Sequence, residues 1–301
     1  MSTAHGRDNM ADVPGGDARQ AGPTALRMLV GAELRRLREA REISRDQAGY
    51  LIRGSQSKIS RLETGRTSFK PRDVDDLLTL YGVTDTAERA ALLALVKQAN
   101  LPGWWQDYRD VIPEWFEDYL GLEQDASLIR TYEVQFVPGL LQTEDYARAV
   151  ISRGCGNEPE ARIERRVAVR THRRQVLTGP SPCRVWAMVD EAALRRPVGG
   201  AAVMRAQLEH LTRMAGLPHI TLQVIPFSTD AVVAGAGPVT LLRFPQAGLA
   251  DVIYLEQLTS AQYLSKADDV GPYLHFLNSL GIHASSPPAT TEMLRRLIAE
   301  L

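Results

Sequence analysis

Residues 44–66 constrain the fold of this chain more than any other stretch, because they contain two helix starts separated by a glycine break. Ser44 and Ser55 can each accept a hydrogen bond from a backbone N–H and so begin a helix. Gly54 can adopt a positive φ at little cost, which is expected to end the first helix. Gly65 fits the left-handed position that follows the end of the second one. The stretch therefore predicts two short helices joined by a tight turn.

The apolar residues of this stretch predict which helix faces are buried. Ala48, Leu51 and Ile52 recur at spacings of three and four residues, which is the pattern of a helix face in a core. In the second helix Ile59 and Leu62 point inward, which leaves its first turn exposed with small polar and basic side chains. A helix-turn-helix places such a helix start against base edges in the major groove of DNA.

Three further helices are expected around this pair, which predicts an all-α domain of five helices over residues 24–100. The first has an apolar stripe of Val30, Leu34 and Leu37, and its arginines lie off that stripe. Pro71 is a favoured first-turn residue and begins the next helix. The expected ranges of the three helices are 26–41, 71–82 and about 84–99.

The charge distribution supports a nucleic-acid partner for this domain. Residues 24–72 hold twelve Lys/Arg and five Asp/Glu, a net charge of +7. The whole chain has 35 Lys+Arg and 36 Asp+Glu, so the remainder carries −8. Basic side chains near phosphates release counterions and supply much of the affinity for DNA. The alternative is that these arginine-rich faces are merely solvated, but the motif beside them favours DNA.

A family resemblance rests on Leu34-Arg-Arg-Leu-Arg38, Ser44, Ser55-Gln-Ser-Lys-Ile-Ser-Arg-Leu-Glu63 and Gly65. With these residues, the stretch 28–82 resembles the helix-turn-helix family of Cro and phage-repressor type, often called the XRE family. Two positions depart from the family pattern. The family often has Leu-Ala where this chain has Ala48-Gly49, and it usually has Gly followed by an apolar residue where this chain has Arg53-Gly54.

The resemblance implies which residues meet DNA. Four residues of the recognition helix would face base edges, and Arg45 would contact the backbone at the start of the preceding helix. Each could instead be a plain surface residue. The resemblance also implies an ion pair between Arg38 and Glu63, which would tie the first helix to the recognition helix. The candidate DNA-binding residues are Ser44, Arg45, Ser55, Gln56, Ser57, Lys58 and Arg61.

The rest of the chain is long enough for a second domain, since 301 residues allow about two. Residues 1–23 are polar and rich in Gly, Asp and Ala, which predicts a disordered tail and not a signal peptide. Residues 101–126 form a connector rich in acidic and aromatic side chains. Its aromatic residues need burial. They could pack between the domains, which is the favoured interpretation, or line a ligand pocket or partner groove.

Alternating helix and strand patterns predict an α+β domain over residues 127–285, with a mixed or antiparallel sheet, and a final helix over 286–301. The expected strands are 127–136, 184–189, 220–225, 239–244 and 252–258, and the expected helices are 143–152, 160–177, 200–215 and 268–280. The arginines of 160–177 could contact DNA flanks or an acidic partner, but a solvated helix face is the favoured interpretation.

This second domain also carries a resemblance. Trp104-Trp105, Tyr119, Leu122-Glu-Gln-Asp-Ala126 and Val137-Pro-Gly-Leu-Leu-Gln-Thr-Glu-Asp-Tyr-Ala147 resemble a C-terminal domain of actinobacterial helix-turn-helix regulators. Those regulators are antitoxin-like and related to the sporulation regulator WhiJ. The resemblance covers about residues 100–285. It implies a regulator that often works with a small partner protein encoded nearby, and it supplies no catalytic residue.

The sequence contains no motif that predicts a catalytic, metal or cofactor site. The six histidines lack metal-ligand spacing, and no nucleophile elbow or phosphate-binding loop is present. His210 is expected at the surface. Cys155 and Cys183 are too few for a disulfide framework, and no apolar run of about 18 residues predicts a membrane span. A cytoplasmic, nucleoid-associated protein without membrane contact is expected.

Together these features predict a sequence-specific regulator of transcription that binds double-stranded DNA as a homodimer and is not an enzyme. The C-terminal domain would respond to a partner protein or a small-molecule effector. One alternative is an antitoxin-like protein that mainly binds a small partner protein and uses DNA binding for autoregulation. The other is an enzyme with a DNA-targeting head.

Overall fold

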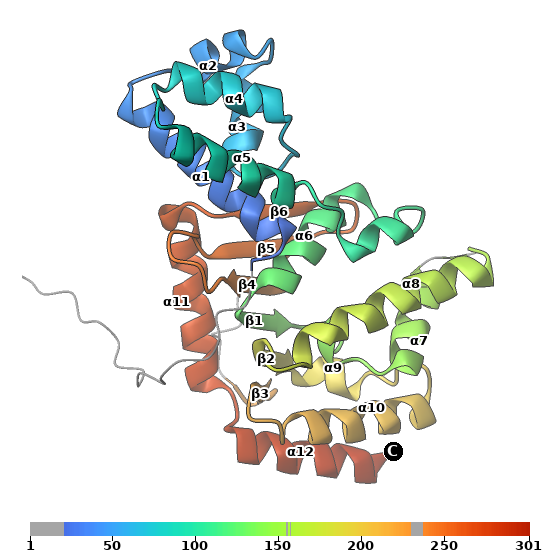
Figure 1. Ribbon diagram of the computed structural model, residues 1–301. Helices are drawn as coiled ribbons and strands as arrows, with labels where there is room; N and C mark the ends of the chain where they lie inside the picture. The colour runs from blue at the N-terminus through green and yellow to red at the C-terminus, as the bar shows by residue number, and fades with distance from the viewer. Residues whose placement is uncertain (1–20, 155, 157, 230–236) are drawn as a thin grey trace, which may run out of the picture.

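The computed structural model describes residues 21–154, 156, 158–229 and 237–301. A helical head is followed by an α+β body, which is the fold class that the sequence predicts. Figure 1 places the head at one end of the molecule, beside β5 and β6, and the last helix at the other end. Residues 1–20 of the expected tail, and Cys155, lie outside the described residues.

The head consists of five helices packed around one apolar core. The core includes Val30 and Leu34 of the first helix, Ile59 of the third, and Leu77 and Tyr81 at the fourth, each at most 2 % exposed. The first helix packs against the third and the fifth. The helices are α1 (Pro23–Ala40), α2 (Arg45–Leu51), α3 (Gln56–Glu63), α4 (Pro71–Leu80) and α5 (Thr86–Ala99).

The helix starts of α2 and α3 are where the sequence predicts them. The Ser44 hydroxyl accepts a hydrogen bond from the Gln47 N–H at 3.2 Å, and the Gln47 side chain accepts one from the Ser44 N–H at 2.8 Å. The Ser55 hydroxyl accepts a bond from the Lys58 N–H at 3.2 Å. Gly65 has a φ of 69°, so the predicted end of the second helix is also confirmed.

The turn between α2 and α3 differs from the prediction in two ways. The positive φ falls on Arg53, at 50°, and not on Gly54. Leu51 was expected in the core but is 43 % exposed, because Ile52 fills the inward position. A β-carbon on Gly49 would lie 3.0 Å from the Gly54 carbonyl oxygen. Glycine at position 49 therefore lets α2 approach the turn closely, which accounts for one departure from the family pattern.

The body is built on a six-stranded mixed sheet with the order β3-β2-β1-β4-β5-β6. β2 is parallel to both of its neighbours, β1 and β3, and the pairs β1–β4, β4–β5 and β5–β6 are antiparallel. The last strand is not predicted from the sequence. The strands are β1 (Leu128–Glu133), β2 (Arg184–Asp190), β3 (Ile220–Ile225), β4 (Val239–Arg243), β5 (Val252–Glu256) and β6 (Ala261–Leu264).

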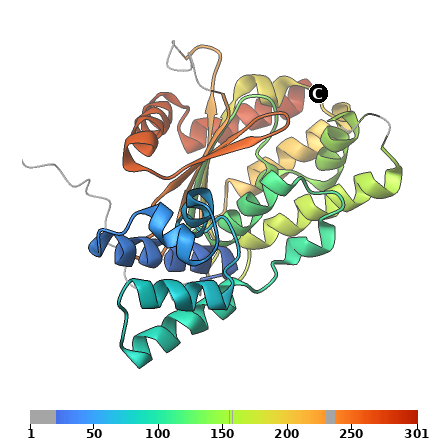
Figure 2. The ribbon, with the colours of Figure 1, turned by 90° about the horizontal axis from the view of Figure 1, so that it is seen from above.

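Helices cover both faces of this sheet, α11 on one side and α8 and α10 on the other (Figure 2). Tyr132 and Met188 face α11, whereas Ile129 and Val185 face the opposite way. The helices that follow the connector are α7 (Glu144–Gly154), α8 (Glu160–Arg173), α9 (Glu191–Arg195), α10 (Ala201–Met214), α11 (Ala267–His283) and α12 (Pro287–Glu300), with short 3-10 turns η2 (Gly139–Leu141) and η3 (Arg174–Leu177). No described helix is long and apolar enough to cross a membrane.

The connector forms a 3-10 turn η1 (Trp104–Tyr108) and a helix α6 (Glu114–Asp125) between head and body. A β-carbon on Gly121 would lie 2.0 Å from the Thr24 hydroxyl oxygen, so α6 and α1 touch through a glycine. Asp125 accepts hydrogen bonds from the N–H groups of Gly22 at 3.1 Å and Ala25 at 2.7 Å. These bonds satisfy free N–H groups at the start of α1 and place negative charge there. The connector thus packs against the head through Gly121 and Asp125, whereas two of its aromatic side chains, Phe116 and Tyr119, line a pocket of the body.

Candidate nucleic-acid interface

The recognition helix α3 has one anchored face and one free face. Ile59 and Leu62 are 1 % and 2 % exposed and hold the inner face in the head core. On the outer face Gln56, Ser57 and Arg61 are exposed. The start of α3 therefore presents polar and basic groups on a surface that the protein itself leaves uncovered.

Lys58 belongs to the same first turn, but its side chain forms an ion pair with another helix of the head. Its Nζ lies 2.5 Å from Asp73 Oδ2 in the first turn of α4. The two side chains are 27 % and 16 % exposed, so this pair is partly shielded from water. The ion pair ties the outer face of α3 to α4, and sequence reasoning did not find it.

Glu63 binds two arginines and joins three helices at the end of α3. Arg38 donates to both Glu63 carboxylate oxygens and also to the Ile43 carbonyl oxygen at 2.7 Å. Arg45 Nε donates to Glu63 Oε2 at 2.9 Å. The hydrogen bond with Glu63 raises the pKa of Arg38 above its ordinary value. The structure therefore places the two implied partners in contact and adds Arg45.

The candidate residues gather at the starts of α2 and α3, two helices that pack together. The hydroxyl groups of Ser44 and Ser55 accept the capping bonds described above and remain exposed. Tyr50, which is 88 % exposed, and Arg53 in the turn flank these helix starts. Neither was selected from the sequence, although Tyr50 interrupts the apolar periodicity of α2 and could have been noticed for that reason.

A contact with the body lies just past the end of α3. Arg66 donates to the Tyr263 carbonyl oxygen at 2.7 Å, and its guanidinium lies 5.7 Å from the centre of the Tyr263 ring. The Tyr263 hydroxyl donates to the Trp115 carbonyl oxygen at 2.7 Å. Burial raises the pKa of this hydroxyl above its usual range. The recognition helix is thus linked to β6 and α6.

The arginines of α8 are only partly on a solvated helix face, because Arg162 and Arg165 are exposed but also bind the connector, and Arg173 is buried. Arg165 donates to both Asp110 carboxylate oxygens at 3.0 and 2.7 Å, and Arg162 donates to the Asp110 carbonyl oxygen at 2.8 Å. Arg173 is only 7 % exposed and pairs with Glu123. These contacts clamp the connector onto the body.

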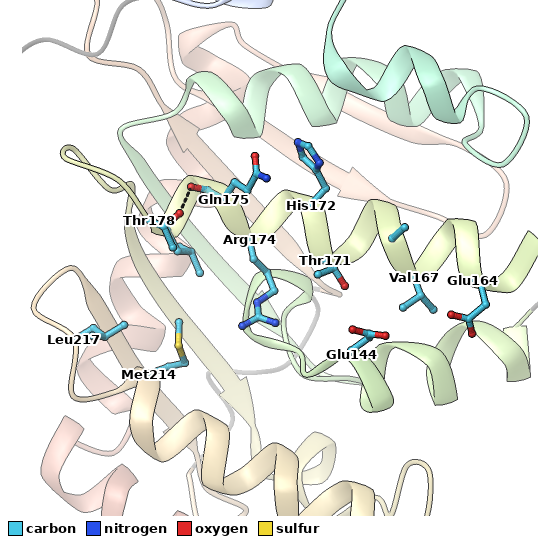
Figure 3. A pocket seen from close by; sticks show the side chains of 12 residues that line it. Glu144, Glu164, Val167, Thr171, His172, Arg174, Gln175, Thr178, Met214 and Leu217 are labelled. Carbon is cyan, nitrogen blue, oxygen red and sulfur yellow. Dashed lines mark hydrogen bonds between the residues drawn. The ribbon is translucent and has the colours of Figure 1, made fainter.

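A shallow hollow of about 650 Å³ lies among α7, α8 and α10. Figure 3 shows Glu144 and Arg174 pointing into it, while His172 points away on the other side of α8. The His172 ring stacks on Trp104 with ring centres 3.9 Å apart. Within the described ranges, no three His, Cys, Asp or Glu side chains are grouped to hold a metal ion.

His210 is not at the surface as expected. It is 8 % exposed on the inner side of α10, and burial with nearby Arg174 and Arg213 lowers the pKa of the His210 imidazole to about 4. The imidazole is therefore neutral at pH 7. Arg213 lies one helical turn after His210 on α10, but the proximity of Arg174 cannot be predicted from the sequence, because Arg174 belongs to η3.

Two families match this chain. Residues 29–92 match a family described as "Helix-turn-helix domain", in agreement with the predicted motif. Residues 116–296, more than half of the chain, match a family described as "Domain of unknown function (DUF5753)". Comparison with curated proteins and with solved structures gave no match.

Proposed function

Because the chain belongs to the DUF5753 family and carries a helix-turn-helix domain, we propose that it is a sequence-specific DNA-binding regulator of transcription. The observation that carries the proposal is the exposed outer face of α3 over an anchored inner face. A recognition helix needs both properties, since it must fit into the groove without shifting in its own domain.

Each candidate residue has a role that suits its chemistry. Gln56 has an amide that can bond two atoms of adenine, and Arg61 can do the same with guanine. Lys58 can reach a base or a phosphate when it leaves Asp73. Ser44, Ser55 and Ser57 have hydroxyl groups that suit phosphate oxygens. The terminal amino groups of Arg45 would meet a phosphate while its Nε stays on Glu63.

A single recognition helix reads only a few base pairs, so we propose that the protein acts as a homodimer. Two copies of α3 would then enter half-sites separated by one turn of DNA, about 10 base pairs. The body would respond to a partner protein or a small-molecule effector. The proposal gives the chain no catalytic role, and turnover of a nucleotide or nucleic acid by the pure protein would contradict it.

The alternative is an antitoxin-like protein that mainly binds a small partner protein. The resemblance of residues 100–285 to the WhiJ-related regulators of actinobacteria supports it. Three large apolar side chains of the body that are 64–97 % exposed also suit a protein partner; they are Phe227, Leu258 and Ile282. Neutralisation of a co-expressed toxin in a growth assay, retained when DNA binding is lost, would favour this alternative.

The test is selection of binding sites from genomic DNA by the full-length protein. We expect a two-fold symmetric operator. Gln56→Ala should weaken specific binding by about 1–3 kcal/mol and relax base choice at one position of each half-site. The matched control Gln98→Ala, an exposed glutamine on α5, should leave the operator and its affinity unchanged. If no DNA fragment is bound at low ionic strength, the proposed function is wrong.

A further inference from the structure

A cavity of about 680 Å³ lies in the body between the sheet and the segment that runs from α6 to α8. Strands β1, β4 and β5 form its floor, and α6, η2 and α8 form its walls. Its volume falls in the range of small-molecule sites, roughly 300–1,000 Å³. The run from Val137 to Gln142, which is part of the resemblance to the regulator family, supplies part of the wall.

The cavity lies where the strand order changes direction. The chain passes from β1 to β2 and β3 on one side, and then returns to β4 on the other side of β1. Ligands of open α/β sheets bind beside the carboxyl ends of strands at such a point; here β1 presents its carboxyl end, and β4, which is antiparallel to β1, presents its start. Glu133 ends β1 and lines the cavity, and the hydroxyl groups of Thr131 and Thr240 meet on its floor at 3.1 Å.

The two arginines of the cavity differ in their partners. Arg173 donates two bonds of 2.8 Å to Glu123, whose carboxylate also accepts from the Tyr119 hydroxyl at 2.9 Å. Arg170, three residues earlier on α8, donates one bond to Gln142 Oε1 at 2.9 Å. No described carboxylate lies within ion-pair distance of Arg170.

Arg170 is therefore a half-buried cation that is held in position by a neutral amide. Burial lowers the pKa of its guanidinium to about 10, so it stays charged at pH 7. The carboxylates of Glu256, Glu123 and Glu133 attract this guanidinium, but none lies within ion-pair distance, so the cost of its desolvation is offset only in part. An anionic group bound directly to Arg170 would offset the rest. Gln142 also donates to the Val137 carbonyl oxygen at 2.7 Å, so it is a positioning residue for Arg170.

The remaining lining fixes the other parts of a ligand. Aromatic rings surround the space, from Phe116, Tyr119, Phe136 and Tyr254. Burial and the nearby Glu256 raise the pKa of Glu133 to about 7. The Glu256 carboxylate accepts from the Tyr254 hydroxyl at 2.8 Å. The cavity thus offers one cation, a flat apolar space and carboxyl groups that can accept a hydrogen bond.

We propose that this cavity binds an amphipathic organic anion. Its acidic group would lie on Arg170, its ring or short apolar body between the aromatic side chains, and a hydroxyl or amine donor near Glu133. The inference rests on the effector role proposed for the body and gives the effector a chemical class. Binding to the cavity can be measured without DNA, so failure of this inference is distinguishable from failure of DNA binding.

The test compares two fluorescent probes that differ in charge, 8-anilinonaphthalene-1-sulfonate and the uncharged N-phenyl-1-naphthylamine, on the full-length protein. The sulfonate should bind one site per chain. Arg170→Gln should lower its affinity at least about tenfold, as expected for a charged hydrogen bond, and change the affinity of the uncharged probe less than threefold. The control Arg174→Gln lies in the hollow of Figure 3 and should change neither affinity.

Glu133→Gln provides a second measurement if Arg170→Gln does not fold. Glu133 faces Arg170 and Arg173 of α8 and Glu256 of β5. Its ionisation above about pH 7 should weaken sulfonate binding, so Glu133→Gln should tighten that binding severalfold at pH 8 and little at pH 6. The proposal would be overturned if the sulfonate did not bind one site per chain, or if Arg170→Gln lowered the affinities of both probes equally. It would also be overturned if Arg174→Gln lowered the sulfonate affinity as much as Arg170→Gln does, or if Glu133→Gln did not change that affinity at pH 8.

Discussion

At the scale of single residues, Glu63 is the position on which the geometry of the interface depends most. Its side chain is 2 % exposed and binds arginines from α1 and α2. Removal of one partner from a buried ion pair leaves an uncompensated charge. Without Glu63, the buried guanidinium of Arg38 would keep only Glu39, at 3.4 Å, as a carboxylate partner. Arg45, which is 33 % exposed, would lose its partner. The end of α3 would lose the contacts that fix it relative to α1 and to the start of α2.

We expect Glu63→Ala to lower the free energy of local unfolding of α3 by about 3–5 kcal/mol. Native-state hydrogen exchange of the α3 amides measures this quantity directly. The control Glu33→Ala removes the partner of Arg36 on α1, where the two side chains are 31 % and 62 % exposed, and should cost about 1 kcal/mol or less. Equal effects of the two substitutions would contradict the role assigned to Glu63.

The ion-pair partners of the candidate DNA-binding residues were the least predictable part of the site. The sequence predicts that α3 has an exposed outer face, because Ile59 and Leu62 fix which side is buried. It does not predict that Asp73 holds Lys58 or that Arg45 reaches Glu63, because these pairs depend on how separate helices are placed. The positive φ of Arg53 was missed because backbone preference alone favours Gly54.

At the scale of elements, local signals predict the head better than the body. Serine caps and apolar periodicity placed α2 and α3 closely. In the sheet, β2 and β3 alternate or are strongly apolar and were predicted, but β6 is a four-residue strand with partly exposed side chains. The short helix α9, five residues long, was missed for a similar reason, since one turn carries little periodicity.

The ion pair between α3 and α4 predicts how the recognition helix responds to substitution. Lys58→Ala should weaken operator binding by about 1–3 kcal/mol. Asp73→Asn should strengthen binding to every DNA sequence, because Lys58 would no longer have to break an ion pair with a carboxylate before it contacts DNA. Titration of labelled operator and unrelated DNA measures both. In the Lys58→Ala chain, the added substitution Asp73→Asn should strengthen DNA binding very little. If it strengthens binding there as much as it does in the wild-type chain, Lys58 does not contact DNA.

At the scale of the whole molecule, aromatic side chains connect the cavity with the head. Phe116 stacks on Tyr119 with ring centres 5.3 Å apart, and Tyr119 lies 4.2 Å from Tyr254. Tyr254 lies 5.3 Å from Tyr263, which contacts Arg66 beyond the end of α3. A ligand that moves Phe116 or Tyr119 would therefore press on a continuous packed path to the recognition helix.

This path predicts a coupling that can be measured as a ratio of affinities. When 8-anilinonaphthalene-1-sulfonate occupies the cavity, the affinity for the operator should change, and the ratio of the two affinities is the coupling factor. Bound operator should change the affinity for the probe by the same factor. Tyr263→Phe keeps the ring but removes the hydrogen bond to the Trp115 carbonyl oxygen. Trp115 directly precedes Phe116 of the cavity wall, so loss of this bond should move the coupling factor toward one while probe binding without DNA stays unchanged. The control Tyr273→Phe alters a tyrosine on α11, on the other face of the sheet, and should keep the full factor; equal factors in both variants would mean that coupling does not pass through Tyr263.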